Sequence, residues 1–411
     1  MRRLTLEAEP ISRGILVACQ YQPKRFFREV PNRLLKEYFQ RRGVLASVPF
    51  DELRETQIDP IYQAWLDLTN DQRNELEQDF QEIDELATEA GSKAILDEAR
   101  WHGEDLAKQF ASLNGFQEHA FWTFLQRPRY WRGALAFNHA DTVSSRFWRK
   151  RKNLPRRPAC VDAASIEQLE KEISHYFHSE QGRGQNCKVD CFRRNELDYF
   201  FAYPEDYAQA RVEWEGTDIA RPARHPAFEI IVVYSQEAGT LDTFLPGDRD
   251  CVKDLQAIFA ETILQSKLGP DAKDEQVYEL DPLRSRDFVF VFNPESGIVD
   301  VRVTKLRLKV IGKNERMVLE ANPDFSRYAV FDLLDKITRV IPLSQVTVTL
   351  VGIRVTFTNN PHSNRPRRKT FEVASPCSCS LKHSERDLKI RKMLIDSGIE
   401  PRLRSTVTQA P

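Results

Sequence analysis

The stretch Ile298-Val-Asp-Val-Arg-Val-Thr-Lys-Leu-Arg-Leu-Lys-Val310 alternates apolar and polar side chains along most of its length. Because successive side chains of a strand point to opposite faces, this pattern predicts a long strand with one buried and one solvated face. The same reasoning predicts further strands at 197–203, 209–215, 228–235, 288–293, 317–321, 345–358 and 370–374. Turn residues at 236–239 and 293–297 predict two hairpins, so this half of the chain is expected to be mixed α and β.

Helical patterns dominate the sequence before this region. Pro31 stands at a helix start and Gly43 at the position of a C-terminal cap. Thr69 and Gln72 have the spacing of a capping box, and the apolar face that follows is expected to run until Gly91. The predicted class is therefore an α+β multidomain protein, with an all-helical domain preceding a mixed α/β domain that contains antiparallel hairpins. Its expected parts are a helical domain at 1–153, a basic linker at 154–165, an α+β domain at 166–404 and a flexible tail at 405–411.

Three predicted helices of the second half carry an Asp-Leu pair after a pair of strands. The pairs are Asp254-Leu255, Asp332-Leu333 and Asp387-Leu388. One hypothesis is that the domain consists of two or three related strand-strand-helix units. The alternative is convergence, because an acidic residue near a helix start is common.

Composition places the chain among globular proteins and predicts its compartment. Of 411 residues, 41% are hydrophobic and 29% are charged, and the net charge is −1. No stretch has the roughly 20 apolar residues that cross a bilayer, and no apolar run near the N-terminus suits a signal peptide. Seven scattered cysteines do not resemble the disulfide framework of a small secreted domain. We therefore expect reduced thiols, no membrane association and a cytoplasmic protein.

Charge is sorted along the sequence. Residues 51–118 hold 18 acidic and 5 basic side chains, whereas residues 127–157, here called the basic block, hold 10 basic and one acidic. Aromatic residues lie among these cations, and such mixtures contact phosphates and bases together. The predicted nucleic-acid-binding residues are Arg129, Trp131, Arg132, Arg146, Trp148, Arg149, Lys150, Arg151, Lys152, Arg156 and Arg157.

A helix is expected in the second half of the basic block. Val143, Phe147 and Leu154 would form its apolar stripe and dock on the helical domain. Arg146, Arg149 and Lys150 would project from another face. Two further basic clusters could extend this surface, at residues 24–42 and 365–369. The predicted partner is DNA or RNA, or an acidic protein; alternatively, the acidic helices neutralise the basic block within the fold.

Sites for metal ions or catalysis are less well supported. His175, His178, Cys187 and Cys191 are ligand types that suit zinc, but cysteines four apart on a strand lie too far apart for shared coordination. Asp198, Glu213, Glu215 and Glu229 could hold a hard cation in a metal-dependent nuclease. Phosphate loops, nucleophile elbows, dinucleotide fingerprints and His-Glu-x-x-His motifs are missing from the sequence, and no cofactor is expected.

These observations predict a non-enzymatic nucleic-acid-binding or adaptor subunit of a larger assembly, acting through the basic block. The first alternative is a scaffold that binds an acidic protein through the same surface. The second is a metal-dependent nuclease that uses the strand carboxylates.

Overall fold

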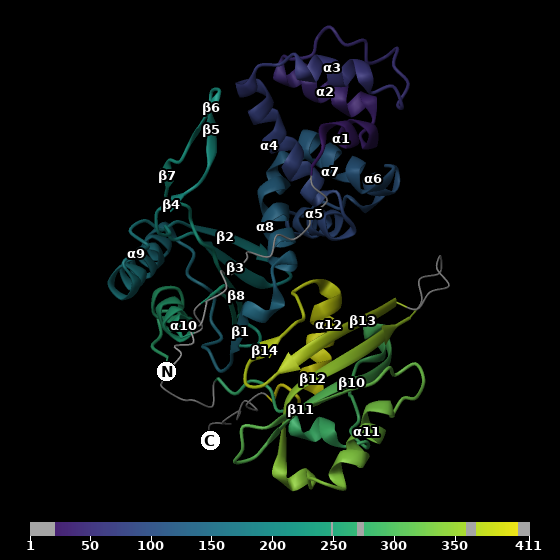
Figure 1. Ribbon diagram of the computed structural model, residues 1–411, viewed down its shortest axis with the longest axis vertical. Helices are drawn as coiled ribbons and strands as arrows, with labels where there is room; N and C mark the ends of the chain where they lie inside the picture. Colours follow the sequence, from purple (N-terminus) through teal and green to yellow (C-terminus); the bar gives the residue numbers. More distant parts are fainter. Residues whose placement is uncertain (1–20, 248–249, 269–274, 359–366, 402–411) are drawn as a thin grey trace, which may run out of the picture. The chain divides into compact units, whose positions relative to one another are not determined.

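The computed structural model describes residues 21–247, 250–268, 275–358 and 367–401 of the chain (Figure 1). It divides into two units, residues 1–139 and 140–411. Helices dominate the first unit and antiparallel sheets the second, which confirms the α+β class. The division falls at residue 139, before the boundary expected at 153, and the expected tail lies outside the described residues. Within the described ranges, no helix is long and apolar enough to cross a membrane.

The first unit is built from helices that bury a cluster of aromatic rings. The rings of Phe26 and Tyr38 lie 4.5 and 4.9 Å from that of Phe80. The predicted cap at Gly43 is present, with a φ of 68°. The helices are α1 (Pro23–Glu29), α2 (Asn32–Arg42), α3 (Asp59–Leu66), α4 (Asn70–Leu86), α5 (Glu89–Trp101), α6 (Ala107–Ala111), α7 (Gly115–Gln126) and α8 (Trp131–Thr142), the last of which crosses the unit boundary.

Helix α4 starts as predicted and ends earlier. Thr69 and Gln72 form the capping box, but the helix stops at Leu86 and Thr88 caps the next one. Gly91 therefore lies inside α5. A Cβ at Gly91 would stand 2.2 Å from the carbonyl oxygen of Leu86, so the close passage of the two helices requires glycine. The expectation that Gly91 ends a helix was wrong.

The second unit contains a first antiparallel sheet with the order β1-β9-β8-β3-β2. Its strands are β1 (Trp148–Arg151), β2 (Val189–Arg194), β3 (Leu197–Ala202), β8 (Ile230–Ser235) and β9 (Thr240–Phe244). The predicted turn at 236–239 joins β8 to β9. Helices α9 (Ala163–Gln181) and α10 (Cys251–Thr262) pack on this sheet through Phe177 and Phe259, which share a core with Phe200.

The expected linker at 154–165 packs on this first sheet. Leu154 is buried in its core, and the hydroxyl of Tyr234 donates to the carbonyl of Arg157 at 2.9 Å. The backbone N–H of Cys160 donates to the carbonyl of Ile263. These contacts make residues 154–160 an integral part of the second unit.

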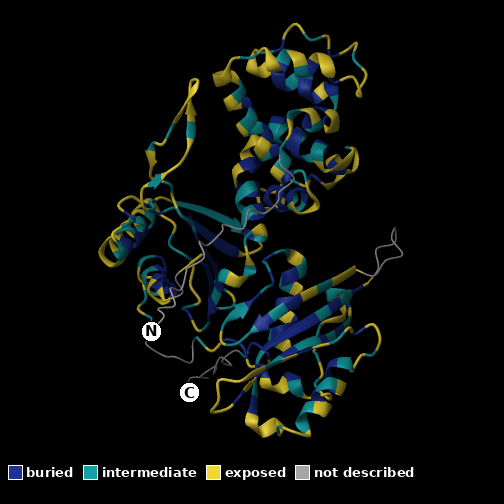
Figure 2. Cartoon of the chain, viewed as in Figure 1, coloured by how far each residue is buried: buried dark blue, intermediate teal, exposed yellow. Residues whose placement is uncertain are grey.

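A two-stranded ribbon leaves this sheet between β3 and β8 (Figure 1). Its paired segments are β4 (Gln209–Ala210) with β7 (Ala223–Arg224), and β5 (Glu213–Glu215) with β6 (Asp218–Ala220). Figure 2 shows most of the ribbon exposed, and Trp214 is 75% exposed beside Ile219, its cross-strand neighbour. Arg183 anchors the base, because its guanidinium pairs with Asp206 and lies 4.0 Å from the ring centre of Phe228.

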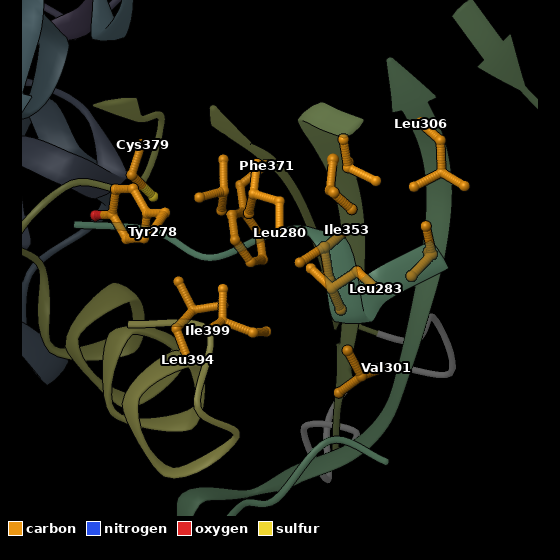
Figure 3. Close-up of a cluster of buried hydrophobic side chains, with 14 of the residues drawn as sticks. Tyr278, Leu280, Leu283, Val301, Leu306, Ile353, Phe371, Cys379, Leu394 and Ile399 are labelled. Atoms are coloured by element: carbon orange, nitrogen blue, oxygen red, sulfur yellow. The ribbon is translucent and has the colours of Figure 1, made fainter. Parts of the chain in front are cut away.

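The second sheet has the order β11-β10-β12-β13-β14. Strand β10 (Ile298–Val310) matches the predicted bounds, and the others are β11 (Arg316–Glu320), β12 (Val346–Phe357), β13 (Arg367–Ala374) and β14 (Ser378–Cys379). Its apolar face packs on α11 (Ala329–Thr338) and α12 (Glu385–Asp396). Figure 3 shows Leu306 and Ile353 from the sheet in the same core as Leu394 and Ile399.

The predicted strand at 288–293 has no ladder partner. The structure assigns no strand to this stretch, so the hairpin expected through 293–297 does not form. The three Asp-Leu helices α10, α11 and α12 each follow a pair of antiparallel strands, namely β8–β9, β10–β11 and β13–β14. Their origin by duplication stays a hypothesis.

Candidate nucleic-acid interface

The boundary between the two units divides the basic block, with residues 127–139 in the first unit and 140–157 in the second. The expected helix over its second half is absent, since a 3₁₀ turn (Ser145–Phe147) leads directly into β1. Trp148 and Lys150 alternate with Arg149 as strand residues do, and the two former are buried.

In the first unit, acidic residues engage the cations of the basic block. Glu104 accepts hydrogen bonds from the hydroxyl of Tyr130 at 2.6 Å, from Arg127 at 2.9 Å and from Arg129 at 2.8 Å. These donors, Tyr130 first, lower the pKa of Glu104 to about 2. Trp131 is buried and its indole N–H donates to Glu82, whereas Arg132 is exposed. Trp131 therefore presents no face for stacking a base.

The basic cluster at residues 24–42 is paired in the same manner. Arg25 contacts Asp84 at 2.6 Å, Lys36 contacts Asp51 at 2.5 Å, and Arg42 forms an ion pair with Asp79. Two of these acids belong to α4, in the acidic stretch. Internal neutralisation, the alternative left open by the sequence, thus accounts for much of the charge of the first unit.

In the second unit, Lys150 and Arg151 point into the protein. The ammonium of Lys150 lies 2.7 Å from a carboxylate oxygen of Glu400, and both side chains are at least 95% buried. Arg151 is buried within 4.0 Å of Glu275. Trp148 is buried against the rings of Phe244 and His383. Trp148, Lys150 and Arg151 are therefore buried in contacts within the protein and do not face solvent, where a nucleic acid would bind.

Beside this ion pair lies a second buried cluster, centred on Asp242 of β9. Nε2 of His383 lies 3.2 Å and Nη1 of Arg391 lies 3.6 Å from one Asp242 oxygen. Burial alone would raise the pKa of Asp242, but the charges of Arg391 and Lys150 and the His383 contact outweigh it and hold the pKa below its usual value. Burial, reinforced by the Arg391 charge, lowers the pKa of His383. This network joins β9 to residues that flank and form α12.

Four cations of the basic block remain at the surface of the second unit. Arg146, Arg156 and Arg157 are exposed and Lys152 is half-exposed, and none of them forms an ion pair with any residue that the structure describes. The guanidinium of Arg146 lies 4.4 Å from the ring centre of Phe147. Arg149 is half-buried and donates to the carbonyls of Arg146 and Trp148. We call Arg146, Lys152, Arg156 and Arg157 the surface cations.

The carboxylates proposed for a nuclease are dispersed. Asp198 is buried on β3, where burial raises its pKa, and Arg193 lies 3.5 Å away. Its cross-strand neighbour Tyr234 is five residues from Glu229, which places the two acids roughly 17 Å apart along the sheet. Glu213 pairs with Arg224 on the ribbon, which also carries Glu215. The structure therefore does not bring these four carboxylates together.

The zinc candidates do not converge either. His175 and His178 are exposed on α9, and burial raises the pKa of the Cys187 and Cys191 thiols to about 12. A zinc ligand must be a thiolate, which these environments oppose. Among the described residues, no group of three or more His, Cys, Asp or Glu side chains has an arrangement suited to a metal ion.

Sequence reasoning missed the ribbon and the Asp242 cluster. The ribbon could have been noticed from Gly216-Thr217 between two short strand-like runs. The Asp242 cluster joins residues 141 positions apart, and no local pattern signals such a contact. No protein-family model matches the chain, and no curated protein is significantly similar to it.

Proposed function

We propose that the protein is a non-enzymatic binding subunit whose second unit contacts nucleic acid through the surface cations. The observation that carries this proposal is that four cations within residues 146–157 lack an acidic partner in the described chain, while Lys150 and Arg151 between them are engaged internally. A phosphate backbone neutralises such cations and releases its condensed counterions, which drives binding. The ring of Phe147 beneath Arg146 also offers a stacking contact to a base.

The proposed interface is independent of base sequence. Arg146 lies in a 3₁₀ turn, and Lys152, Arg156 and Arg157 lie in the irregular stretch after β1. The surface cations therefore do not form a helix or strand face that could read base edges. Phosphate contacts position a protein on nucleic acid, whereas contacts with base edges specify a sequence. We therefore expect binding to DNA and RNA of any sequence, as in an assembly where another subunit supplies specificity.

The test is fluorescence anisotropy with labelled single- and double-stranded DNA and RNA at several salt concentrations. The variant R146E/K152E/R156E/R157E should lose binding. Its control is K171E/K188E/R224E/K389E, in which the same charge is reversed at cations of the same unit that already have acidic partners.

The control should keep most of the affinity. If both variants lose the same affinity, binding depends on the net charge of the protein and not on the surface cations. A wild-type protein that binds no nucleic acid at low salt would refute the proposal. Thermal unfolding of each variant tests whether the fold is retained. Reversal of Lys150 or Arg151 is avoided, because it would place a negative charge beside the carboxylate of Glu400, which is buried, or of Glu275.

The ribbon supports a second candidate function, binding of a protein partner. Val212 and Ile219 are 62% and 54% exposed near Trp214, and an isolated two-stranded ribbon is at best marginally stable in water. Tryptophan residues often dominate protein interfaces. Trp214→Ala should abolish capture of a co-purifying partner and leave nucleic-acid binding intact. Trp101→Ala, at an exposed tryptophan of the first unit, is the matched control.

A further inference from the structure

The segment Phe288-Val-Phe-Val-Phe292, here called the FVFVF segment, has the side-chain pattern of a strand. Val289 and Val291 are 73% and 51% exposed, whereas the three phenylalanines are half-buried and pack against the core of the second sheet. This alternation indicates an extended backbone with one face on the core. The FVFVF segment thus has the character of a strand, but it pairs with no other strand of the described chain.

One edge of the FVFVF segment is occupied and the other is open. Ser397 binds both backbone groups of Val291: the N–H donates to its Oγ at 2.9 Å, and the hydroxyl donates to the carbonyl at 3.4 Å. In an extended chain, neighbouring residues direct their backbone groups to opposite edges. The groups of Phe290, the N–H of Phe292 and the carbonyl of Phe288 therefore face the other edge. No described residue forms a hydrogen bond with them.

A hollow of about 430 Å³ borders the FVFVF segment. Its other walls include Val301 of β10, Arg327 and Phe331. Backbone groups in proteins are paired or hydrated. An open edge with an apolar, β-branched and aromatic sequence is a template for another strand.

We propose that this strand is the same segment of a second copy of the chain, paired antiparallel about Phe290. Phe-Val-Phe-Val-Phe reads identically in both directions, so a twofold axis at Phe290 places Phe288 opposite Phe292 and Val289 opposite Val291. Two hydrogen bonds join the Phe290 residues, and the Phe292 N–H of each copy binds the Phe288 carbonyl of the other.

The occupied edge decides the size of the assembly. Because Ser397 holds the Val291 groups, each copy offers its other edge, and the pairing joins the open groups of Phe288, Phe290 and Phe292 by four hydrogen bonds. The association is isologous and closes as a dimer instead of extending into a fibre. This inference does not depend on nucleic-acid binding, since the surface cations lie outside the FVFVF segment.

Sedimentation of the full chain over a wide concentration range tests the proposal. Phe290→Pro removes the central N–H, which has no partner among the residues that the structure describes, and should sediment as a monomer. Phe290→Ala is the matched control, because it loses the same side chain but keeps the N–H, and it should remain dimeric. The wild type should be a dimer.

Disulfide cross-linking tests the register. In the proposed pairing, positions 289 and 291 of different copies lie directly opposite, about 4.5 Å apart between Cα atoms, within reach of a disulfide. The variant V289C/V291C should therefore form a covalent dimer on oxidation. Val289→Cys alone should not, because its two copies are offset by two residues, about 7 Å along the strands. The wild-type chain, oxidised in the same way, is the control for cross-links that form through the native cysteines.

Each result decides between outcomes. A wild type that sediments as a monomer at every concentration would overturn the proposal, and so would a dimer that survives Phe290→Pro. If both Phe290 variants are monomeric, the cysteine pair decides: without a covalent dimer the FVFVF segment is not the interface, and binding of an extended peptide from another protein becomes the alternative.

Discussion

Replacing Lys150 by methionine should destabilise the second unit strongly. The side chains of Lys150 and Glu400 are 5% and 1% exposed and their charged atoms lie 2.7 Å apart, so the substitution leaves a buried carboxylate without its partner. One oxygen of Glu400 already lacks a hydrogen-bond partner in the described part of the chain. Breaking a buried pair from one side costs about 3–5 kcal/mol of unfolding free energy. This would distinguish a structural lysine from the binding residue that the sequence suggested.

Urea unfolding followed by tryptophan fluorescence measures the effect, because Trp148 lies two residues away. The double variant K150M/E400M removes both charges and should recover most of the loss, since buried pairs exchanged for apolar residues are often neutral. Lys152→Met, at a half-exposed position without an ion pair in the described chain, should change stability by no more than about 0.5 kcal/mol. Equal effects of Lys150→Met and Lys152→Met, or a double variant as unstable as the sum of the single ones, would refute the reasoning.

Three further outcomes are expected. If the four surface cations neutralise four phosphates, a plot of log affinity against log salt concentration should have a slope of about −3.6. The affinity for DNA should then fall about 150-fold between about 50 and 200 mM salt. A slope near zero would contradict the role of the surface cations. Asp242 has a pKa below its unfolded value of roughly 3.9, so its stabilisation is complete above that pH and is lost as the pH falls toward the folded pKa. The stability difference between wild type and Asp242→Asn, measured by urea unfolding, should therefore shrink below about pH 4. Burial raises the pKa of the Cys187 thiol to about 12, so little of the reactive thiolate is present at pH 8 in the native protein. Iodoacetamide should therefore alkylate Cys187 at least about a hundredfold faster in the unfolded chain than in the native one. Mass spectrometry measures the two rates.

Features set by local sequence were predictable, as two elements illustrate. The alternation over 298–310 gave the bounds of β10, because a long strand with one solvated face requires that period. The capping box at Thr69 gave the start of α4 for a similarly local reason. The end of α4 depended on a contact between Gly91 and Leu86 across a helix junction, which the helical period does not record.

The candidate site was less predictable because its character depends on distant partners. Residues 143–154 have apolar spacings that fit a helix, yet pairing of Trp148–Arg151 with β9 makes part of this stretch a strand. Two of its cations are buried because Glu400 and Glu275 lie beside them, far away in sequence. The FVFVF segment shows the converse case, in which a strand-like sequence meets no partner strand within the described chain.

The ion pair between Lys150 and Glu400 can form only late in the synthesis of the chain. A ribosome adds Glu400 250 residues after Lys150, a delay of roughly 12–50 s at 5–20 residues per second. Throughout that interval the ammonium group of Lys150 lacks its ion-pair partner, so this contact cannot yet hold β1. Ion pairs of the first unit can form earlier, as that of Arg25 with Asp84 does. In the second unit, this ion pair can form only after translation has passed α12 and reached Glu400.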